Sequence, residues 1–409
     1  MFRSPRMLTI WLLGFSSGLP LVLTGSTLQA WFTEAGVGIM TIGLLSLVGM
    51  PYVWKFLWAP VLDRFVPPWG GRRRGWVALT QLALCVALFI LANLSPQNNA
   101  GLMGLMALVI AFFSASQDVA IDAYRTEVLS PSERGLGAAN YIFAYRIAML
   151  FAGGLALVFA DYIGWRMTYE WMAVLMGLSV ITTYKAKEPS QFIIAPKTFT
   201  AAVVEPFRNL WRRENIILIL LFIVLYKIGD ALALSLMSNF LLKNLGFTLS
   251  TVGITYKTFG LVATIFGAFC GGLLLSNLNI YRALFLFGLA QAISNLMFVI
   301  LAMVGKNYLL MASSIGIESF CSGMSTAALV AFLMSLCELR YTATQFALLS
   351  ALSSIGRVIL GPVAAIMVKK MGWVDYFTWA FLMSFPGLFL IGFLRKQVLS
   401  NETVVTESD

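Results

Sequence analysis

Two aspartates lie close together inside a long apolar stretch of the first half of the chain. Asp118 and Asp122 are four residues apart, and Arg125 follows three residues later, so a helix places all three on one face. Two carboxylates that close, in partly dry surroundings, do not both ionise readily. The pair therefore indicates a site that takes up and releases a proton. For Asp122 the alternative is a structural ion pair with Arg125.

A second set of ionisable residues lies in apolar stretches of the other half. Lys227 and Asp230 are three residues apart, so they can neutralise each other as a purely structural pair. Glu318 has no basic residue one helical turn away. It must be protonated or have a partner on another helix, because an isolated charge in a membrane helix is costly. Asp230 and Glu318 are therefore further candidates for proton coupling.

Each half also contains one arginine in an apolar stretch, Arg146 and Arg357, and neither has an acidic residue one turn away. A guanidinium keeps its charge in proteins, so each must find an anion. We expect these stretches to cross a membrane. The two arginines would then bracket an anionic substrate near the membrane midplane and bind its carboxylates. The alternative is a permanent pairing with Asp118, Asp230 or Glu318.

The 409 residues include no histidine. This excludes imidazole proton relays, His-ligated metals and the His-dependent membrane hydrolases and acyltransferases. No phosphate-binding loop of the form G-x-x-x-x-G-K-[ST] occurs either. We therefore expect no enzyme activity, no metal, no cofactor and no direct coupling to ATP. Energy for uphill transport would come from an ion gradient.

The elements that carry these residues are expected to be transmembrane helices. The chain is 59% hydrophobic and 11% charged, whereas soluble proteins are about 25% charged. Its apolar runs of about 18–25 residues are long enough to cross a hydrocarbon core of about 30 Å. The twelve expected spans are residues 8–32, 39–59, 76–94, 100–123, 136–160, 167–184, 215–242, 250–275, 283–304, 307–335, 343–368 and 374–394.

The ionisable residues are distributed unevenly over these spans. Ranges 76–94, 283–304 and 376–394 contain none, and 167–184 has only Glu170 near one end. A charge at the bilayer centre costs about 2.5–3.5 kcal/mol, so it persists where it faces protein or a wet cavity. The charged spans are therefore expected to surround a central polar pathway, as in a transporter. The uncharged spans, one at every third position, are expected to face lipid.

The Lys and Arg residues of the short loops fall mostly on one side of this topology. This asymmetry predicts that both termini are cytoplasmic. The formal net charge of +10 is then mostly a topology signal. We expect no nucleic-acid partner, because the basic residues are scattered over loops.

The longest polar stretch divides the spans into two equal sets. We expect an N-terminal six-helix bundle at 1–184, a cytoplasmic linker at 185–214, a C-terminal six-helix bundle at 215–396 and a cytoplasmic tail at 397–409. The fold class is therefore an all-α integral membrane protein with twelve transmembrane helices in two pseudo-symmetric six-helix bundles.

The loop after the second span resembles the G-x-x-x-D-R-x-G-R-R signature of the major facilitator superfamily. The match comprises residues 59–64 and 71–74 and implies a breakable ion-pair latch on the cytoplasmic face. The latch would consist of Asp63, Arg64, Arg72 and Arg73. Here the first Gly is missing and residues 67–70 are inserted. The alternative is an ordinary basic loop that fixes orientation.

Further segments resemble the AmpG family of muropeptide permeases within that superfamily, with the major facilitator fold. They are 55–60, 114–118, 122–129, 133–135, 318–328, 345–352, 356–357 and 361–362. The resemblance covers essentially all twelve spans, although part of it is shared with acetyl-CoA transporter-like proteins. Ser319 and Ser325 stand where the family pattern has Asn and Gly.

The resemblance implies proton-driven import of 1,6-anhydro-muropeptides across the cell inner membrane, from periplasm to cytoplasm, by alternating access. The expected partners are this small sugar-peptide substrate, protons and the lipid bilayer, and we expect a monomer. Alternatives are a facilitator for another anionic solute, such as a CoA ester, and a non-transporting membrane sensor. Besides Arg146 and Arg357, such a substrate needs further cations, neutral hydrogen-bonding groups and rings that stack on sugars. The candidates are Lys227, Lys257, Gln29, Gln117, Asn140, Gln345, Tyr145 and Tyr226, the tyrosines having packing as an equal alternative.

Overall fold

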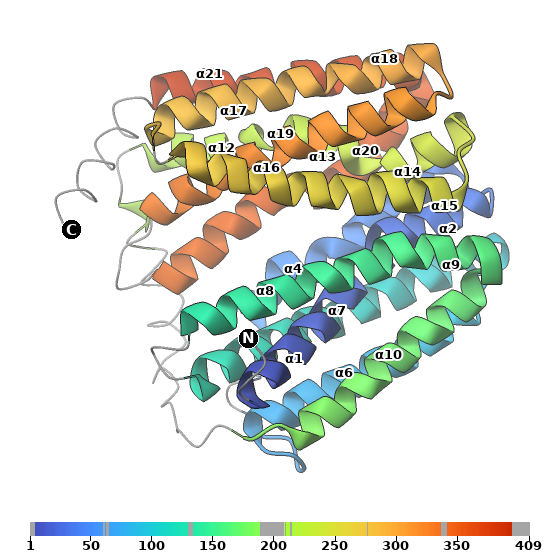
Figure 1. Cartoon of the computed structure of the whole chain (residues 1–409), viewed down its shortest axis with the longest axis vertical. Coiled ribbons are helices and arrows are strands. Elements are labelled where there is room, and N and C mark those ends of the chain that lie inside the picture. Colours follow the sequence, from blue (N-terminus) through green and yellow to red (C-terminus); the bar gives the residue numbers. More distant parts are fainter. Residues whose placement is uncertain are drawn as a thin grey trace. The chain divides into compact units, whose positions relative to one another are not determined.

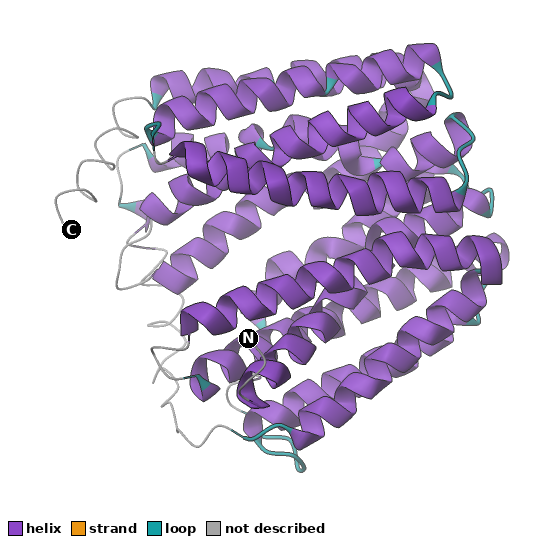
Figure 2. Ribbon diagram, viewed as in Figure 1, coloured by secondary structure: helices purple, strands orange, loops and turns teal. Residues whose placement is uncertain are grey.

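The computed structural model describes residues 5–59, 62, 65–129, 134–188, 208, 210–212, 215–275, 277–336 and 342–394. Within these ranges all regular structure is helical and no strand occurs (Figures 1 and 2). Helices satisfy their own backbone hydrogen bonds, which is required in a hydrocarbon core without water. The predicted all-α membrane class is confirmed.

Nine helical segments of the described residues are long and apolar enough to cross a membrane. They are Pro5–Glu34, Arg72–Ala92, Pro96–Arg125, Asn140–Ile163, Ile216–Asn244, Leu249–Leu275, Ile280–Val304, Tyr308–Ser335 and Leu348–Phe393. The last holds the two final expected spans, which meet at Gly372, where φ is 80°. The second and sixth expected spans correspond to the shorter apolar helix Ile39–Trp54 and to α10 (Trp165–Lys185).

The described chain forms two compact units. Unit 1 comprises 1–197 and 248–254, and unit 2 comprises 198–247 and 255–409. The helices of unit 1 are α1 (Pro5–Val22), η1 (Leu23–Thr27), α2 (Leu28–Glu34), α3 (Ile39–Leu44), η2 (Leu45–Gly49), α4 (Met50–Trp54), η3 (Lys55–Leu57), α6 (Arg72–Ala92), α7 (Pro96–Val128), α8 (Arg134–Leu150), η5 (Phe151–Leu155), α9 (Ala156–Ile163), α10 and α15 (Leu249–Val252). The expected boundaries of the linker and tail stay predictions.

Unit 2 has a comparable set of helices. They are α12 (Ile216–Tyr226), α13 (Ile228–Ser235), α14 (Met237–Asn239), η6 (Phe240–Asn244), η7 (Gly253–Phe259, from residue 255 onward), α16 (Gly260–Leu275), α17 (Ile280–Ser294), α18 (Leu296–Val304), α19 (Tyr308–Ser335), α20 (Thr342–Leu382) and α21 (Phe385–Phe393). The α16 and α19 helices pack closely, and α13 packs on α20. Figure 1 shows α17 and α18 in line with each other beside α21.

Two glycines bring α1 and α8 of unit 1 into direct backbone contact. A Cβ atom at Gly14 would lie 2.6 Å from the carbonyl oxygen of Tyr141, and one at Gly18 would lie 2.5 Å from that of Tyr145. Small residues at such crossings let membrane helices approach closely. This contact holds the side chains of α1 against those of α8 and α7.

The helices expected to face lipid have exposed apolar stripes. On α10 the stripe is spaced by three or four residues, which corresponds to one helix face. Its members are Met167, Trp171, Val174, Leu178 and Ile181. The α6 helix has a similar exposed set, and α21 exposes Phe389 and Phe393. Such surfaces are suited to hydrocarbon. Because α16, which belongs to a charged span, exposes a similar apolar set, the expected lipid-facing position of the uncharged spans stays a prediction.

Candidate functional site

Asp118 belongs to a polar cluster formed by three helices of unit 1. Its carboxylate accepts a hydrogen bond from the hydroxyl group of Ser17 on α1. The Ser17 oxygen also lies 2.8 Å from the hydroxyl oxygen of Tyr141 on α8. Ser17 and Tyr141 are buried, whereas Asp118 is half-buried. The cluster gives Asp118 a fixed partner and leaves it partly accessible.

Asp122, one turn further along α7, contacts a cation. The Arg125 guanidinium nitrogen lies 3.2 Å from Asp122 Oδ1, and the Asp122 side chain is 49% exposed. The same guanidinium lies over the Tyr141 ring, 4.6 Å from its centre. This geometry supports the structural ion pair for Asp122 rather than the proton site.

Gln117 and Asn140, expected to bind substrate, are completely buried. Gln117 Nε2 donates to Ser16 Oγ over 3.1 Å, and Asn140 Nδ2 donates to the Met7 carbonyl over 2.7 Å. Both contacts join α1 to a neighbouring helix, so the structure places these amides in helix packing. Each amide nitrogen thus has a partner, whereas Gln117 Oε1 and Asn140 Oδ1 accept no hydrogen bond from a described residue.

Arg146 is an exposed cation within a membrane-spanning helix of unit 1. Its guanidinium has a contact of 4.0 Å with Met149 Sδ, and no carboxylate of the described residues forms an ion pair with it. Tyr145 beside it is half-buried, with its ring centre 6.3 Å from that of Tyr141. Gln29 on α2 is buried. Arg146 is therefore accessible to a ligand, Tyr145 is partly accessible, and Gln29 is largely covered.

The basic residues of the expected latch contact a carboxylate that sequence reasoning did not select. Asp63 and Arg64 lie outside the described residues. Nitrogens of Arg72 and Arg73 lie 3.0 and 2.6 Å from Glu127 Oε1, near the end of α7. This links the start of α6 to the end of α7.

A second carboxylate lies at the same end of unit 1. Glu188 accepts hydrogen bonds from the backbone N–H groups of Arg73 and Arg74, over 2.8 and 3.0 Å. These N–H groups are in the first turn of α6, where helix donors have no intrahelical partner. The latch region is therefore a network that connects α6, α7 and the end of α10.

Lys227 of unit 2 lies where the seventh apolar span is broken. Between α12 and α13 its backbone has φ −105° and ψ 2°. Its ammonium nitrogen lies 2.8 Å from Ser325 Oγ, 3.2 Å from Gln291 Oε1 and 3.7 Å from Asp230 Oδ2. Three acceptors match its three N–H donors. The structure therefore places Lys227 in an internal network, although it was expected to bind substrate.

Glu318 on α19 faces the same network. It is 2% exposed, and its carboxyl group lies within hydrogen-bonding reach of that of Asp230. Ser319 Oγ donates to Glu318 Oε2 over 3.4 Å, and Ser322 Oγ donates to Asp230 Oδ2 over 3.5 Å. The partner that Glu318 was expected to find on another helix is thus a second carboxyl group.

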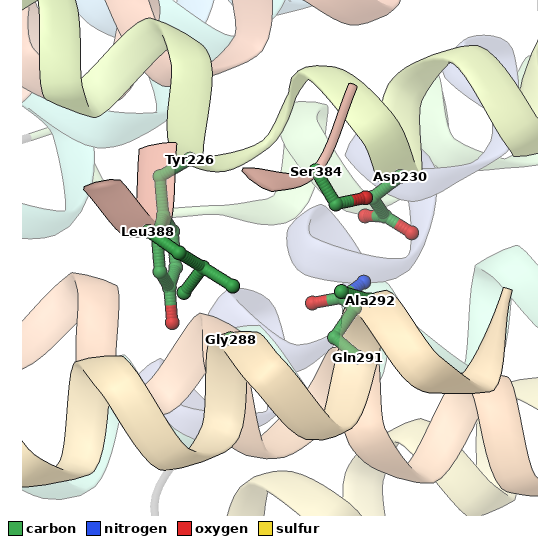
Figure 3. Close-up of a pocket in the computed structure, with 7 residues that line it drawn as sticks. All are labelled: Tyr226, Asp230, Gly288, Gln291, Ala292, Ser384 and Leu388. Carbon is green, nitrogen blue, oxygen red and sulfur yellow. The ribbon is translucent and has the colours of Figure 1, made fainter. Parts of the chain in front are cut away.

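A small cavity of about 10 Å³ adjoins this network. Its lining residues are Tyr226, Asp230, Gly288, Gln291, Ala292, Ser384 and Leu388. Figure 3 shows the Gln291 amide directed toward Asp230 and Ser384. About 10–15 Å³ suffices for one water, which is far below the size of a sugar-peptide. The cavity is a polar gap in the packing of unit 2.

The remaining candidates of unit 2 differ in accessibility. Arg357 on α20 is exposed, and it forms no ion pair with a described residue. Lys257 is half-buried, with its ammonium 4.1 Å from the centre of the Tyr256 ring. Gln345 and Tyr226 are buried, and the Tyr226 hydroxyl donates to the Leu284 carbonyl over 3.0 Å. Arg357 is therefore the most accessible cation of this set.

Sequence reasoning missed several residues of these clusters, among them Ser17, Glu127, Glu188 and Gln291. The available signal was a polar side chain within or at the end of an apolar span, since such a group needs a partner. Gln291 is an amide in a span without ionisable residues. The two positions that depart from the family pattern, Ser319 and Ser325, both contact the network of unit 2.

Comparison with known proteins extends these observations. The Major Facilitator Superfamily model matches residues 8–359. The anhydromuropeptide permease of Escherichia coli (strain K12) is 48% identical over 396 residues, which cover 97% of this chain and 81% of that protein. The chain belongs to the AmpG family of the major facilitator superfamily. A putative transporter AmpG 1 of Rickettsia conorii is 32% identical to this AmpG-family chain, covering 96% of it and 98% of the relative.

Solved structures agree with this AmpG-family assignment at the level of fold. A D-xylose-proton symporter superposes with a TM-score of 0.73 at 12% identity, covering 94% of this chain and 96% of the other. A POT family transporter in complex with 5-aminolevulinic acid gives 0.77 at 10% identity, covering 97% and 98%. The predicted major facilitator fold is confirmed. This AmpG-family protein is a multi-pass membrane transporter and not an enzyme.

Proposed function

We propose that this protein imports 1,6-anhydro-muropeptides from the periplasm into the cytoplasm, driven by the proton gradient. The observation that carries the substrate is the 48% identity, along 97% of the chain, with an anhydromuropeptide permease. A short peptide joined to sugars has carboxylates and hydroxyl groups. Transport of such a ligand needs exposed cations and a group that changes its charge.

The proposed substrate contacts begin with Arg146 and Arg357. Both are exposed, and neither guanidinium is neutralised by an ion pair with a described residue. A planar guanidinium can bind a carboxylate through two parallel hydrogen bonds. Lys257 and Tyr145 are half-buried and are secondary contacts in this proposal. Gln29, Gln117, Asn140, Gln345, Tyr226 and Lys227 support the helices that carry the site.

The proposed proton-coupling groups are Asp118, Asp230 and Glu318. Each is a carboxyl group in a membrane-spanning helix, and the chain has no histidine that could substitute for it. A carboxyl group at such a place is costly when charged, so taking up a proton stabilises it. Alternating access would then couple proton entry to substrate movement.

The proposed orientation places both termini and the Arg72–Arg73–Glu127 contact on the cytoplasmic side of the inner membrane. The support is the distribution of Lys and Arg over the loops. A cysteine-accessibility scan of the loops in intact cells checks this orientation. Labelling of loop positions 66 and 188 by an impermeant thiol reagent added outside intact cells would contradict it.

The central experiment measures uptake of radiolabelled anhydro-muropeptide by proteoliposomes with an imposed pH gradient, acidic outside. We expect accumulation that a protonophore abolishes. Unlabelled anhydro-muropeptide should compete, whereas a CoA ester should not. Uptake unaffected by the protonophore would refute proton coupling, and competition by the CoA ester alone would refute the substrate.

A further inference from the structure

We propose that Asp230 and Glu318 share a single proton between α13 and α19, and that Lys227 is the fixed counter-ion that positions this pair. The use of this proton in import depends on the proposed function, but its presence in the protein does not. Lys227 is then a positioning residue and not a substrate contact.

The two carboxyl groups are poorly supplied with donors. Asp230 is 8% exposed and Glu318 is 2% exposed. Asp230 Oδ1 and Glu318 Oε1 accept no hydrogen bond from any described residue. A buried polar atom without a partner costs about 1–3 kcal/mol, and more when it is charged. Because the two carboxyl groups lie within hydrogen-bonding reach of each other, one proton between them supplies a missing donor.

The charge balance of the network also favours one proton on the two carboxyl groups. Lys227 contributes one positive charge and lies 3.7 Å from Asp230. Arg357 is exposed and forms no ion pair with a described residue. If both buried carboxyl groups were ionised, one negative charge would therefore remain without a cation in contact, which is strongly unfavourable. With one proton on the pair, the lysine and the two carboxyl groups are neutral together. Loss of that proton leaves a net negative charge.

The surrounding elements add few other titratable groups. The charged groups near Glu318 are Asp230 and Lys227, and the uncharged titratable groups Tyr256 of η7 and Cys321 of α19 lie within range of its charge. Arg357 of α20 acts on Lys227, and Tyr226 ends α12. Among the helices packed nearby, α16 contains the titratable residue Cys270, and α17 contains Tyr281 and Arg282 at its start. The α18 helix contains no titratable residue.

Lys227 is held in place by uncharged groups as well as by Asp230. Its contacts with Ser325 and Gln291 measure 2.8 and 3.2 Å. These acceptors come from α19 and α17, so the ammonium is fixed by three segments of unit 2. A cation whose donors are all engaged is poorly placed to bind a substrate carboxylate. It is well placed to set the pH range over which the pair keeps its proton.

The test uses infrared difference spectroscopy of the purified full-length protein in lipid, without substrate, over a pH series. We expect a band from a protonated carboxyl group that Glu318→Gln removes and that Asp230→Asn shifts, because its hydrogen-bond partner changes. Lys227→Met should let the band persist to higher pH than in the parent, since a positive charge is lost. Lys227→Arg should retain the parental profile more closely than Lys227→Met. Glu170→Gln, in the exposed pair with Arg166, is the matched control and should change nothing.

Three results would overturn the shared proton or the role of Lys227. The shared proton is overturned if no band of the parent spectrum is removed by Glu318→Gln, or if the band does not shift in Asp230→Asn. The role of Lys227 is overturned if the pH profile of the band is unchanged in Lys227→Met. If Lys227→Met does not fold, the neutral double variant Lys227→Met/Asp230→Asn replaces it, and the band should then persist to higher pH than in Asp230→Asn alone. An unchanged profile there overturns the role of Lys227. A parent with the expected band but without muropeptide uptake would instead refute the proposed function and leave the pair intact.

Discussion

Arg73 contacts Glu127 through two of its guanidinium nitrogens, 2.6 and 3.0 Å from the same carboxylate oxygen. Both residues are buried, at 6% and 9% exposure. Arg72 reaches that oxygen as well, over 3.0 Å. The contact joins the first turn of α6 to the last turn of α7, so it fixes the two helices at one end of unit 1.

Glu127→Ala should destabilise the protein more than the loss of a surface ion pair does. Breaking a buried pair by removing one partner costs about 3–5 kcal/mol, because the other charge is left buried. The control is Glu170→Ala, which breaks the Arg166–Glu170 pair, whose arginine is exposed, and should cost about 0.3–0.5 kcal/mol. Thermal unfolding in detergent measures both. Equal shifts of the midpoint in the two variants would contradict the importance of the Glu127 contact.

Asp118→Asn should abolish accumulation driven by the pH gradient while counterflow exchange of labelled muropeptide persists. The amide keeps the shape of the carboxyl group but cannot exchange a proton at physiological pH. Uptake and counterflow in proteoliposomes separate the two activities. Normal accumulation in this variant would remove Asp118 from proton coupling.

Ser17→Ala should alter the pH dependence of uptake, because it deletes the hydrogen bond that Asp118 accepts. Hydrogen bonds to charged groups contribute about 1.5–3 kcal/mol, so the ionised form of Asp118 becomes less favourable. The pH at half-maximal uptake should therefore rise. Ser179→Ala is the control, since that hydroxyl donates to the Met176 carbonyl of its own helix. If both variants give the parental pH profile, the Ser17 contact has no part in coupling.

Arg146→Lys and Arg357→Lys should each weaken muropeptide binding by about tenfold or more, which is about 1.4 kcal/mol. A lysine keeps the charge but loses the two parallel hydrogen bonds of a guanidinium. Binding of labelled muropeptide to purified protein measures the effect. Arg166→Lys in the exposed pair with Glu170 provides the control. Parental affinity in both variants would show that these arginines are not substrate contacts.

Gly14→Ala should destabilise the protein, because its Cβ would meet the Tyr141 carbonyl oxygen at 2.6 Å. Overpacking of this kind typically costs about 1–3 kcal/mol. Gly104→Ala is the matched control, since nothing lies within 4 Å of a Cβ there and the residue is in α7. That variant should be neutral or more stable, because alanine favours a helix by about 1 kcal/mol over glycine. A midpoint of thermal unfolding that falls as much in Gly104→Ala as in Gly14→Ala would refute the close α1–α8 contact.

The sequence by itself determined the class of the protein and the residues at which chemistry can occur. Apolar runs of membrane-spanning length specify helices, because backbone groups must be satisfied within each segment in lipid. Charges such as those of Asp118 and Glu318 stand out, since each is costly unless the fold provides a partner. The exposed apolar stripe of α10 follows from the same rule, applied to a span with only Glu170.

Only the tertiary structure decided which groups are partners. Periodicity relates residues within one helix, so it paired Asp122 with Arg125 and Lys227 with Asp230. It could not show that Ser17 faces Asp118 or that Glu127 binds Arg73, because those contacts join helices far apart in sequence. Nor could it separate Lys227, whose donors are filled by Ser325 and Gln291, from the exposed Arg357. Burial and hydrogen-bond partners depend on how helices pack, and the close packing at glycines such as Gly14 and Gly18 sets that geometry in unit 1.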